Sequence, residues 1–361
     1  MLVACSPYPT PSPSLSVETP FAIDVLPATP THPELRPVIS LENANKLTPL
    51  LIWEAGITYA AWSPNKNYVG ISTISDKGEY GVSVLDVNEL PFIQYIQEAS
   101  GKVIFSPDGN LMVSEDGVLN LWEINTGKKL RSYGGNAERW VAFHSETSIL
   151  IVQSFPPSFD KNRVGLWNIK TGEYTDNLEI NGIARNISHN YSLSFLALSI
   201  IEKPDKYRIV VWDINLQKQI CDIPDALSAE FDEGNDLLIV NNGKEFSFWD
   251  VKKCEIKRNL IVELAPRYSF AVSPDGNLLV FDNGSGKISI VNAKSGVRVA
   301  ELKTPRFNTN IIKFSPDGNI LLTLSNDDLT TTRTLALWQV NHPSLELIIV
   351  PLETPPILKN R

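Results

Sequence analysis

The chain has 361 residues, a formal net charge of −9 and a pI of about 5.1. This acidic balance excludes the basic footprint that nucleic-acid binding needs. No segment is apolar enough to span a bilayer, so any link to a membrane would be through a lipid.

Directly after Met1, the sequence Leu2-Val3-Ala4-Cys5 resembles the lipobox of bacterial lipoproteins. The resemblance implies that Cys5 carries a lipid anchor and that residues 1–5 are the remnant of a signal peptide. The alternative is an ordinary terminus with an unrelated cysteine. A basic and then apolar stretch encoded in frame upstream of Met1 would favour the lipoprotein.

The segment after Cys5 has a different composition from the rest of the chain. From Ser6 to Pro37 there are nine prolines in 32 residues, and the first basic residue is Arg36. Such a segment cannot bury a core, so residues 6–38 are predicted to form a disordered tether. Residues 40–46 are then expected to form one capped helical turn.

A short turn sequence recurs along the remaining chain. Phe105-Ser106-Pro107-Asp108-Gly109-Asn110 returns in the range 314–319 and, with valine first, in the range 272–277. Pro presets the first turn angle and Asp-Gly tolerates a positive φ, so each copy predicts a hairpin turn. Weaker copies begin at Trp62, Phe143, Ile187 and Phe231. Together they define seven units spaced by 38 to 44 residues.

A strand motif recurs with the same spacing as the turns. Each unit has an alternating strand that ends in an aromatic or aliphatic residue followed by a polar one. Five of the eight tryptophans occupy this end position. The seven strand ends are Leu85, Trp122, Trp167, Trp212, Trp249, Val291 and Trp338. These repeated aromatics are interpreted as core residues.

Four short strands per unit, the repeat length and the pairs Trp212-Asp213 and Trp249-Asp250 resemble the WD-repeat β-propeller family. The resemblance implies an all-β fold, a seven-bladed β-propeller of four-stranded antiparallel blades over residues 39–350, followed by a tail at 351–361. The Gly-His pair that usually opens a unit of this family is absent from every unit. This departure places the chain nearer to divergent bacterial propellers.

Two segments compete to complete the last blade. Residues 47–53 form an extra apolar strand before the first unit, and residues 344–350 form one after the last. Propellers of this family usually close with an N-terminal strand, so closure by 47–53 is expected, with 344–350 packed alongside. The sequence leaves both arrangements open.

No residue set is typical of a catalytic centre, and no metal site or cofactor is predicted. Cys221 and Cys254 lie in the outer strands of neighbouring units, nine residues after Trp212 and five after Trp249. Because these depths differ, no disulfide between them is predicted.

Three units carry an Arg-aromatic pair just before the first strand, where a propeller presents the mouth of its channel. Arg beside an exposed aromatic is typical of binding surfaces for proteins, carboxylates or sugars. Alternatively, the aromatics cap the core and the arginines pair with carboxylates. The candidate ligand-binding residues are Arg139, Trp140, Arg267, Tyr268, Arg306 and Phe307.

The sequence therefore predicts a non-catalytic, monomeric binding or assembly platform for a protein, peptide or glycan, outside the cytoplasm and anchored to a bacterial membrane. Two alternatives remain. One is a propeller enzyme: a hydrolase, a lyase or a quinone-dependent dehydrogenase. The other is a cytoplasmic WD-repeat scaffold in which the lipobox match is accidental.

Overall fold

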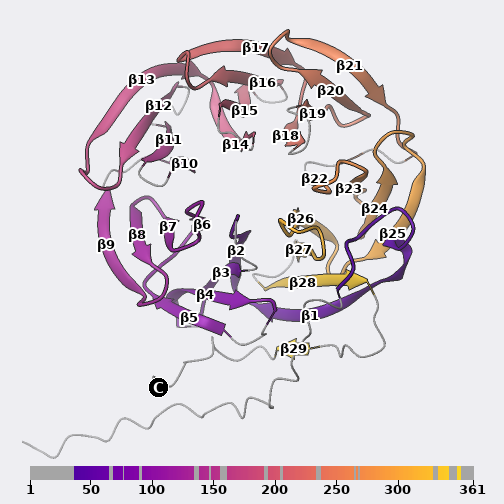
Figure 1. Ribbon diagram of the computed structural model, residues 1–361, viewed down its shortest axis with the longest axis horizontal. Coiled ribbons are helices and arrows are strands. Elements are labelled where there is room, and N and C mark those ends of the chain that lie inside the picture. Colours follow the sequence, from indigo (N-terminus) through magenta and orange to yellow (C-terminus); the bar gives the residue numbers. More distant parts are fainter. Residues whose placement is uncertain are drawn as a thin grey trace, which may run out of the picture.

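The computed structural model describes residues 36–350 except 65–67, 76, 89–91, 134–137, 146–147, 155–160, 191–193, 204–205, 233–236, 264–265, 267–268, 328–331 and 341–347. Its sheets are arranged in a ring around a central channel (Figure 1). The first strand of each consecutive set lies beside the channel, and the later strands follow outward. Within the described ranges, no helix is long and apolar enough to cross a membrane.

Six sheets have four antiparallel strands each, in chain order from the channel outward. They are β2 (Ile57–Trp62), β3 (Tyr68–Ile74), β4 (Tyr80–Asp86) and β5 (Phe92–Gln97); β6 (Lys102–Phe105), β7 (Leu111–Glu115), β8 (Leu119–Glu123) and β9 (Lys128–Tyr133); β10 (Glu138–Ser145), β11 (Ser148–Ser154), β12 (Lys161–Asn168) and β13 (Tyr174–Asn181); β14 (Ile183–His189), β15 (Phe195–Lys203), β16 (Lys206–Asp213) and β17 (Lys218–Pro224); β18 (Ser228–Asp232), β19 (Leu237–Asn241), β20 (Phe246–Asp250) and β21 (Glu255–Leu260); β22 (Phe270–Val272), β23 (Leu278–Asp282), β24 (Lys287–Asn292) and β25 (Arg298–Lys303).

One further sheet has five strands, in the order β26 (Asn308–Phe314), β27 (Leu321–Asn326), β28 (Arg333–Val340), β1 (Leu47–Ala55) and β29 (Ile348–Val350). The β1 strand is antiparallel to β28, and β29 is parallel to β1. The N-terminal strand therefore closes the ring, and the C-terminal strand lies alongside it, as expected.

The predicted fold class, seven four-stranded antiparallel blades, is wrong. Six sheets have that form, but the sheet that joins the two ends of the ring has a fifth, parallel strand. The physical reason is that this sheet takes strands from both ends of the chain: β1 from the N-terminal side fills the fourth place, so the C-terminal strand β29 pairs with the outer edge of β1.

The repeated turn sequence forms the hairpin between the first and second strands of its sheet, as predicted. In the first strong copy, Asp108 Oδ1 accepts hydrogen bonds from Ser106 Oγ and from the backbone N–H of Asn110. The same bonds recur in the other two copies. Gly109, Gly276 and Gly318 have φ values of 65°, 70° and 73°, which confirms the predicted left-handed position.

The core lies between neighbouring sheets. For example, Leu278 and Val280 of β23 pack in one cluster with Ile312 of β26 and Leu321 of β27. The predicted core role of the third-strand tryptophans is confirmed for those that are buried, namely Trp122, Trp167, Trp212 and Trp338. Trp249 is only partly buried, although it packs against the cluster between the β14–β17 and β18–β21 sheets.

The first described residues pack against the closing sheet. Ile39 is fully buried, and its N–H donates to the carbonyl of Gly318. The predicted helical turn at 40–46 is present as one 3-10 turn, η2 (Ala44–Lys46). Arg36 belongs to the range predicted as a tether, yet it is 5% exposed and its Nη1 donates to Asn88 Oδ1. Residues 6–35 of the predicted tether and Cys5 lie outside the described residues.

A disulfide joins Cys221 of β17 to Cys254, with the two Cα atoms 5.2 Å apart. The prediction that these cysteines do not pair is therefore wrong. Cys254 lies in the turn before β21 rather than within an outer strand, and it has a φ of 54°. The number of residues between Trp249 and Cys254 therefore did not predict how far Cys254 lies from the channel.

We expect Gly276→Val to lower the free energy of unfolding by about 1 kcal/mol or more, because a β-branched residue is strained at a positive φ. Gly276→Asn is the matched control, since Asn tolerates the left-handed conformation better. Chemical denaturation of both variants measures the difference. Equal stability of the two variants would show that the turn imposes no such strain.

We expect Cys221→Ser and Cys254→Ser each to lower the free energy of unfolding by about 3–4 kcal/mol, the chain-entropy value for a link across 33 residues. The double variant should be no less stable than either single one, because all three lack the same bond. Denaturation midpoints with and without reductant provide the measurement. A wild-type protein insensitive to reductant would contradict the prediction.

Candidate functional site

A pocket of about 560 Å³ lies in the central channel. Its lining comes from the channel-facing strands β2, β14, β18, β22 and β26, together with residues of β15 and β16. This volume lies within the range of small-molecule sites in proteins. The lining residues are Tyr59, Asn186, Ile187, Ser199, Ile200, Ile201, Tyr207, Leu227, Ser228, Glu230, Ser269, Phe270, Asn310, Ile311, Ile312 and Lys313.

The pocket is built by the alternation of side chains along the first strands. Phe231 is buried between sheets, so its neighbour Glu230 points into the channel. Phe314 and Lys313 repeat this relation in the last sheet. The same strands thus supply both the core and the lining of the pocket.

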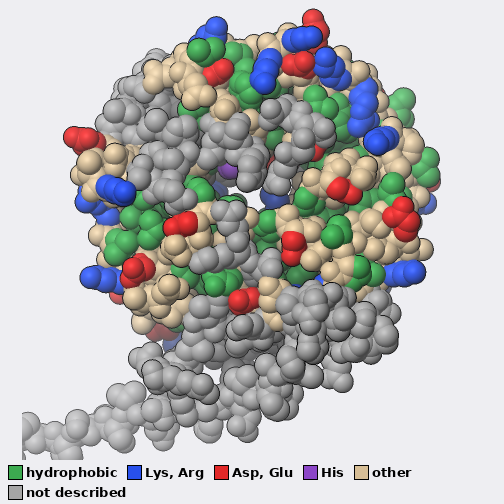
Figure 2. Space-filling model, viewed as in Figure 1, with side chains coloured by type: hydrophobic (Ala, Val, Ile, Leu, Met, Phe, Trp, Pro, Cys, Tyr) green, Lys and Arg blue, Asp and Glu red, His purple; other side chains and the backbone are tan. Residues whose placement is uncertain are grey.

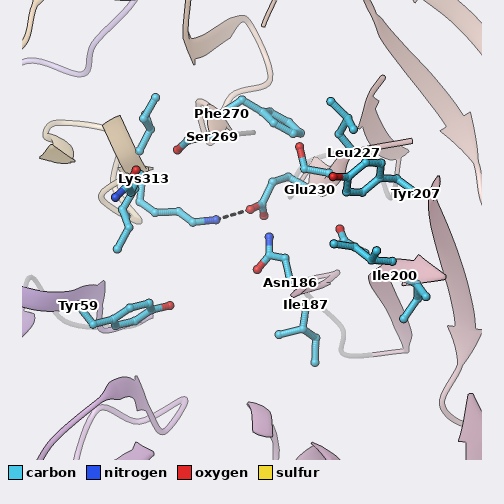
Figure 3. Close-up of a pocket in the computed structure, with 16 residues that line it drawn as sticks. Tyr59, Asn186, Ile187, Ile200, Tyr207, Leu227, Glu230, Ser269, Phe270 and Lys313 are labelled. Carbon is cyan, nitrogen blue, oxygen red and sulfur yellow. Dashed lines mark hydrogen bonds and ion pairs between the residues drawn. The ribbon is translucent and has the colours of Figure 1, made fainter. Parts of the chain in front are cut away.

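An ion pair occupies the middle of the pocket. Lys313 Nζ on β26 lies 2.7 Å from Glu230 Oε1 on β18, and Figure 3 shows the lysine extending across the pocket to the carboxylate. The lysine side chain is 45% exposed and the glutamate side chain 19% exposed. The pair reaches past β22, which lies between these two strands in the ring (Figure 1).

Glu230 is held by a second contact. Ser188 Oγ on β14 donates to Glu230 Oε2 at 3.2 Å and accepts from the N–H of Phe231 at 3.1 Å. Ser188 is 6% exposed, so its hydroxyl positions Glu230 and is not presented to a ligand as a nucleophile. The Glu230 carboxylate is therefore held from two sides, by Ser188 of β14 in the neighbouring sheet and by Lys313 of the more distant β26.

Two further titratable side chains lie near the pair. Burial raises the pKa of the Tyr59 phenol above its usual range, so Tyr59 stays protonated and can donate a hydrogen bond. Desolvation by the packed atoms around it lowers the pKa of the His189 imidazole, although the residue as a whole is exposed. His189 interacts electrostatically with Glu230 and Lys313.

The arrangement is suited to binding rather than to holding a metal. Its described lining residues offer one anion, one cation, amides, hydroxyls and apolar side chains around a single space. Over the described ranges, no group of three or more His, Cys, Asp or Glu side chains could hold a metal ion.

The structure places the predicted Arg-aromatic pairs in different ways. Arg306 and Phe307 precede β26, and Phe307 is 55% exposed. Arg139 and Trp140 lie in β10, where the backbone alone is described. Arg267 and Tyr268 lie outside the described residues. That the pairs form one ligand surface stays a prediction.

The Arg306 guanidinium pairs with carboxylates, as the alternative interpretation expects. Its Nη1 lies 2.6 Å from Asp327 Oδ2, and its Nη2 lies 3.5 Å from Glu54 Oε1. The hydrogen bond from Arg306 holds the pKa of the Asp327 carboxyl below its usual range. Of the six predicted ligand residues, Arg306 and Phe307 have described side chains, and neither of these two lines the channel pocket.

Sequence reasoning did not nominate the pocket residues, although a signal was present. Glu230 and Lys313 occupy the same place in their units, immediately before the first residue of the turn sequence. The equivalent residues in the other units are Ala61, Ile104, Ala142, Asn186 and Ala271. Two opposite charges at an otherwise uncharged repeat position mark the pocket.

Comparison with solved structures supports the architecture. The β-propeller domain of Myceliophteria thermophila Cps50 (Swd1) matches with a TM-score of 0.62 and 14% identity, over 79% of this chain and 96% of that one. The chain has a WD-repeat-like β-propeller fold.

Among curated proteins, the chain is 25% identical over 246 residues to eukaryotic translation initiation factor 3 subunit I of Aspergillus terreus. The match covers 65% of this chain and 63% of that protein, so it spans less than two thirds of the relative's length. No protein-family model matches the sequence.

The lowered pKa of His189 predicts a pH dependence of stability. Between its ordinary pKa of about 6.5 and the lower folded-state pKa, the unfolded chain binds more protons at this residue than the folded chain does. The stabilisation that the neutral His189 imidazole contributes is fully present above the ordinary pKa. It is lost as the pH falls through the folded-state pKa.

We therefore expect the loss of Tm between roughly pH 7 and pH 5 to be smaller in His189→Gln than in the wild type. His32→Gln, in the predicted tether, is the control and should leave the loss unchanged. Thermal unfolding at several pH values measures both. An identical pH dependence in all three proteins would contradict the assignment.

Proposed function

We propose that this protein is a non-catalytic binding and assembly platform that works outside the cytoplasm, tethered to a membrane by a lipid on Cys5. Its partner is a protein or peptide that docks on a face of the ring, and the channel pocket adds a small-molecule site. The observation that carries the binding role is the pocket, which combines an ion pair with polar and apolar groups in a rigid ring.

The similar proteins support this role without establishing it. The curated relative is named as a subunit of a translation factor, which describes a protein that works within an assembly. Neither it nor the similar solved propeller is named as an enzyme. The fold likeness alone does not assign a partner, since propellers carry many functions.

The disulfide supports the proposed compartment. Disulfides persist in oxidising environments and are rare where thiols are kept reduced, apart from special cases. The Cys221–Cys254 bond links two neighbouring sheets and is thus part of the ring itself. This argument is independent of the resemblance of residues 2–5 to a lipobox.

The tether is tested by expressing the gene from its own chromosomal locus, with its natural upstream sequence, in the wild type and in Cys5→Ala. We expect the wild type to incorporate a labelled fatty acid and to fractionate with membranes, and Cys5→Ala to do neither. Alkylation before lysis should show Cys221 and Cys254 oxidised in both. Unlipidated wild-type protein with free thiols in the cytoplasm would contradict the proposal.

The platform role is tested by photocross-linking in intact cells from Phe307, which is 55% exposed beside the first strand of the last sheet. Leu216, 61% exposed in the turn between β16 and β17, is the matched control on the opposite face of the ring. One defined protein product from Phe307, absent from Leu216, is expected. Equal, diffuse cross-linking from both positions would contradict a specific docking face.

A further inference from the structure

The ion pair in the channel lies outside the apolar clusters that pack the sheets together. The core lies between the sheets, and in the other units the equivalent position is filled by the uncharged residues Ala, Ile or Asn. Because the lysine is 45% exposed, the pair is partly solvated, and ion pairs in contact with solvent contribute little to stability. The pair therefore calls for an explanation in terms of binding.

The two charges differ in the exposure and the length of their side chains. Glu230 is 19% exposed and is held by Ser188 as well as by Lys313. Lys313 reaches Glu230 with a long flexible side chain that is 45% exposed. A ligand can enter between the two when the lysine ammonium moves while the carboxylate stays in place.

Charge balance decides which ligand can separate the pair. A ligand with a single charge would satisfy one partner and leave the other unbalanced inside the ring, which is costly. A ligand that carries both an ammonium and a carboxylate satisfies both. Resting on the proposed binding function, we propose that the channel pocket binds a small zwitterion, an α-amino acid with an apolar side chain.

In this arrangement the ligand ammonium lies against the Glu230 carboxylate and the ligand carboxylate against Lys313 Nζ. The pocket supplies further polar groups for the remaining hydrogen bonds. Asn186 lies beside Glu230, and Tyr59 lies on the side of the pocket from which Lys313 enters (Figure 3). The protonated Tyr59 hydroxyl is a donor suited to the ligand carboxylate.

The apolar residues that line the pocket indicate which kind of ligand side chain it would accept. Phe270, Leu227, Tyr207 and Ile200 are grouped on the Glu230 side of the pocket (Figure 3). An aliphatic or aromatic side chain packed there would be removed from water, which favours Leu-like or Phe-like ligands over glycine. The space-filling view shows the opening at the centre of the ring through which such a ligand would enter (Figure 2).

The test is isothermal titration calorimetry on the full chain, with L-leucine and L-phenylalanine as probes. N-acetyl-L-leucine keeps only the negative charge, and L-leucine amide keeps only the positive one. We expect the zwitterions to bind roughly tenfold or more tightly than either single-charge analogue, the usual loss for one charge-assisted contact. Glycine should bind more weakly than L-leucine.

Two variants each remove one charge of the Glu230–Lys313 ion pair. In Glu230→Gln the ammonium loses its partner, so L-leucine should fall to the affinity of N-acetyl-L-leucine. In Lys313→Met the carboxylate loses its partner, so L-leucine should fall to the affinity of L-leucine amide. Lys287→Met removes the Lys287–Glu301 pair between β24 and β25 and is the matched control, with unchanged binding expected.

Circular dichroism of each variant reports folding, and either charge variant alone suffices to test the pair. The proposal is overturned if no zwitterion binds at millimolar concentration, or if both charge variants bind L-leucine as the wild type does. A neutral disaccharide that binds equally to all variants would overturn it in favour of a sugar ligand. These results are separate from the proposed function, because lipidation and cross-linking from Phe307 do not depend on amino-acid binding.

Discussion

The antiparallel pairing of β1 with β28 is the interaction on which the rest of the structure depends. Each sheet of a repeat protein buries its apolar faces only against its neighbours, so an open ring would leave two faces in water. Trp53 and Leu51 of β1 prevent this, because they pack with Leu335 of β28 and with Val69 of β3 in one cluster. The first and last sheets thus become neighbours.

Closure also creates the channel site. With the ring closed, β2 lies next to β26, and the indole N–H of Trp62 donates to the carbonyl of Lys313. Tyr59 and Lys313 therefore line one wall although they are far apart in the sequence. The far wall, with Glu230, comes from the middle of the chain, so the pocket exists only when the two ends have joined.

The sequence was sufficient for features that are local and repeated. Each Ser-Pro-Asp-Gly turn carries its own geometry, since the Asp108 carboxylate accepts from Ser106 and Asn110 within the same turn. The alternating strands and their buried tryptophans follow from a period of two. The closing strand was also anticipated, because residues 47–53 have no partner in a unit of their own.

Features that depend on contacts between units could not be predicted in the same way. A bulge between Val211 and Trp212 shifts the pairing of β16 with β17, so that Cys221 lies opposite Val211. Counting from the tryptophan then misplaces the cysteine relative to Cys254 in the next unit. The pocket likewise combines residues from several sheets.

The site and the disulfide concern the same junction in the ring. Cys221–Cys254 links the outer part of the β14–β17 sheet to the β18–β21 sheet, and Ser188–Glu230 links their channel edges. These two sheets are thus linked at both ends of their shared interface, and Glu230 takes part in the link beside the channel. A carboxylate fixed in this way costs little further ordering when a ligand arrives, so the rearrangement on binding is left to the Lys313 side chain. The outer covalent bond and the inner hydrogen bond together make the anionic half of the pocket its rigid half.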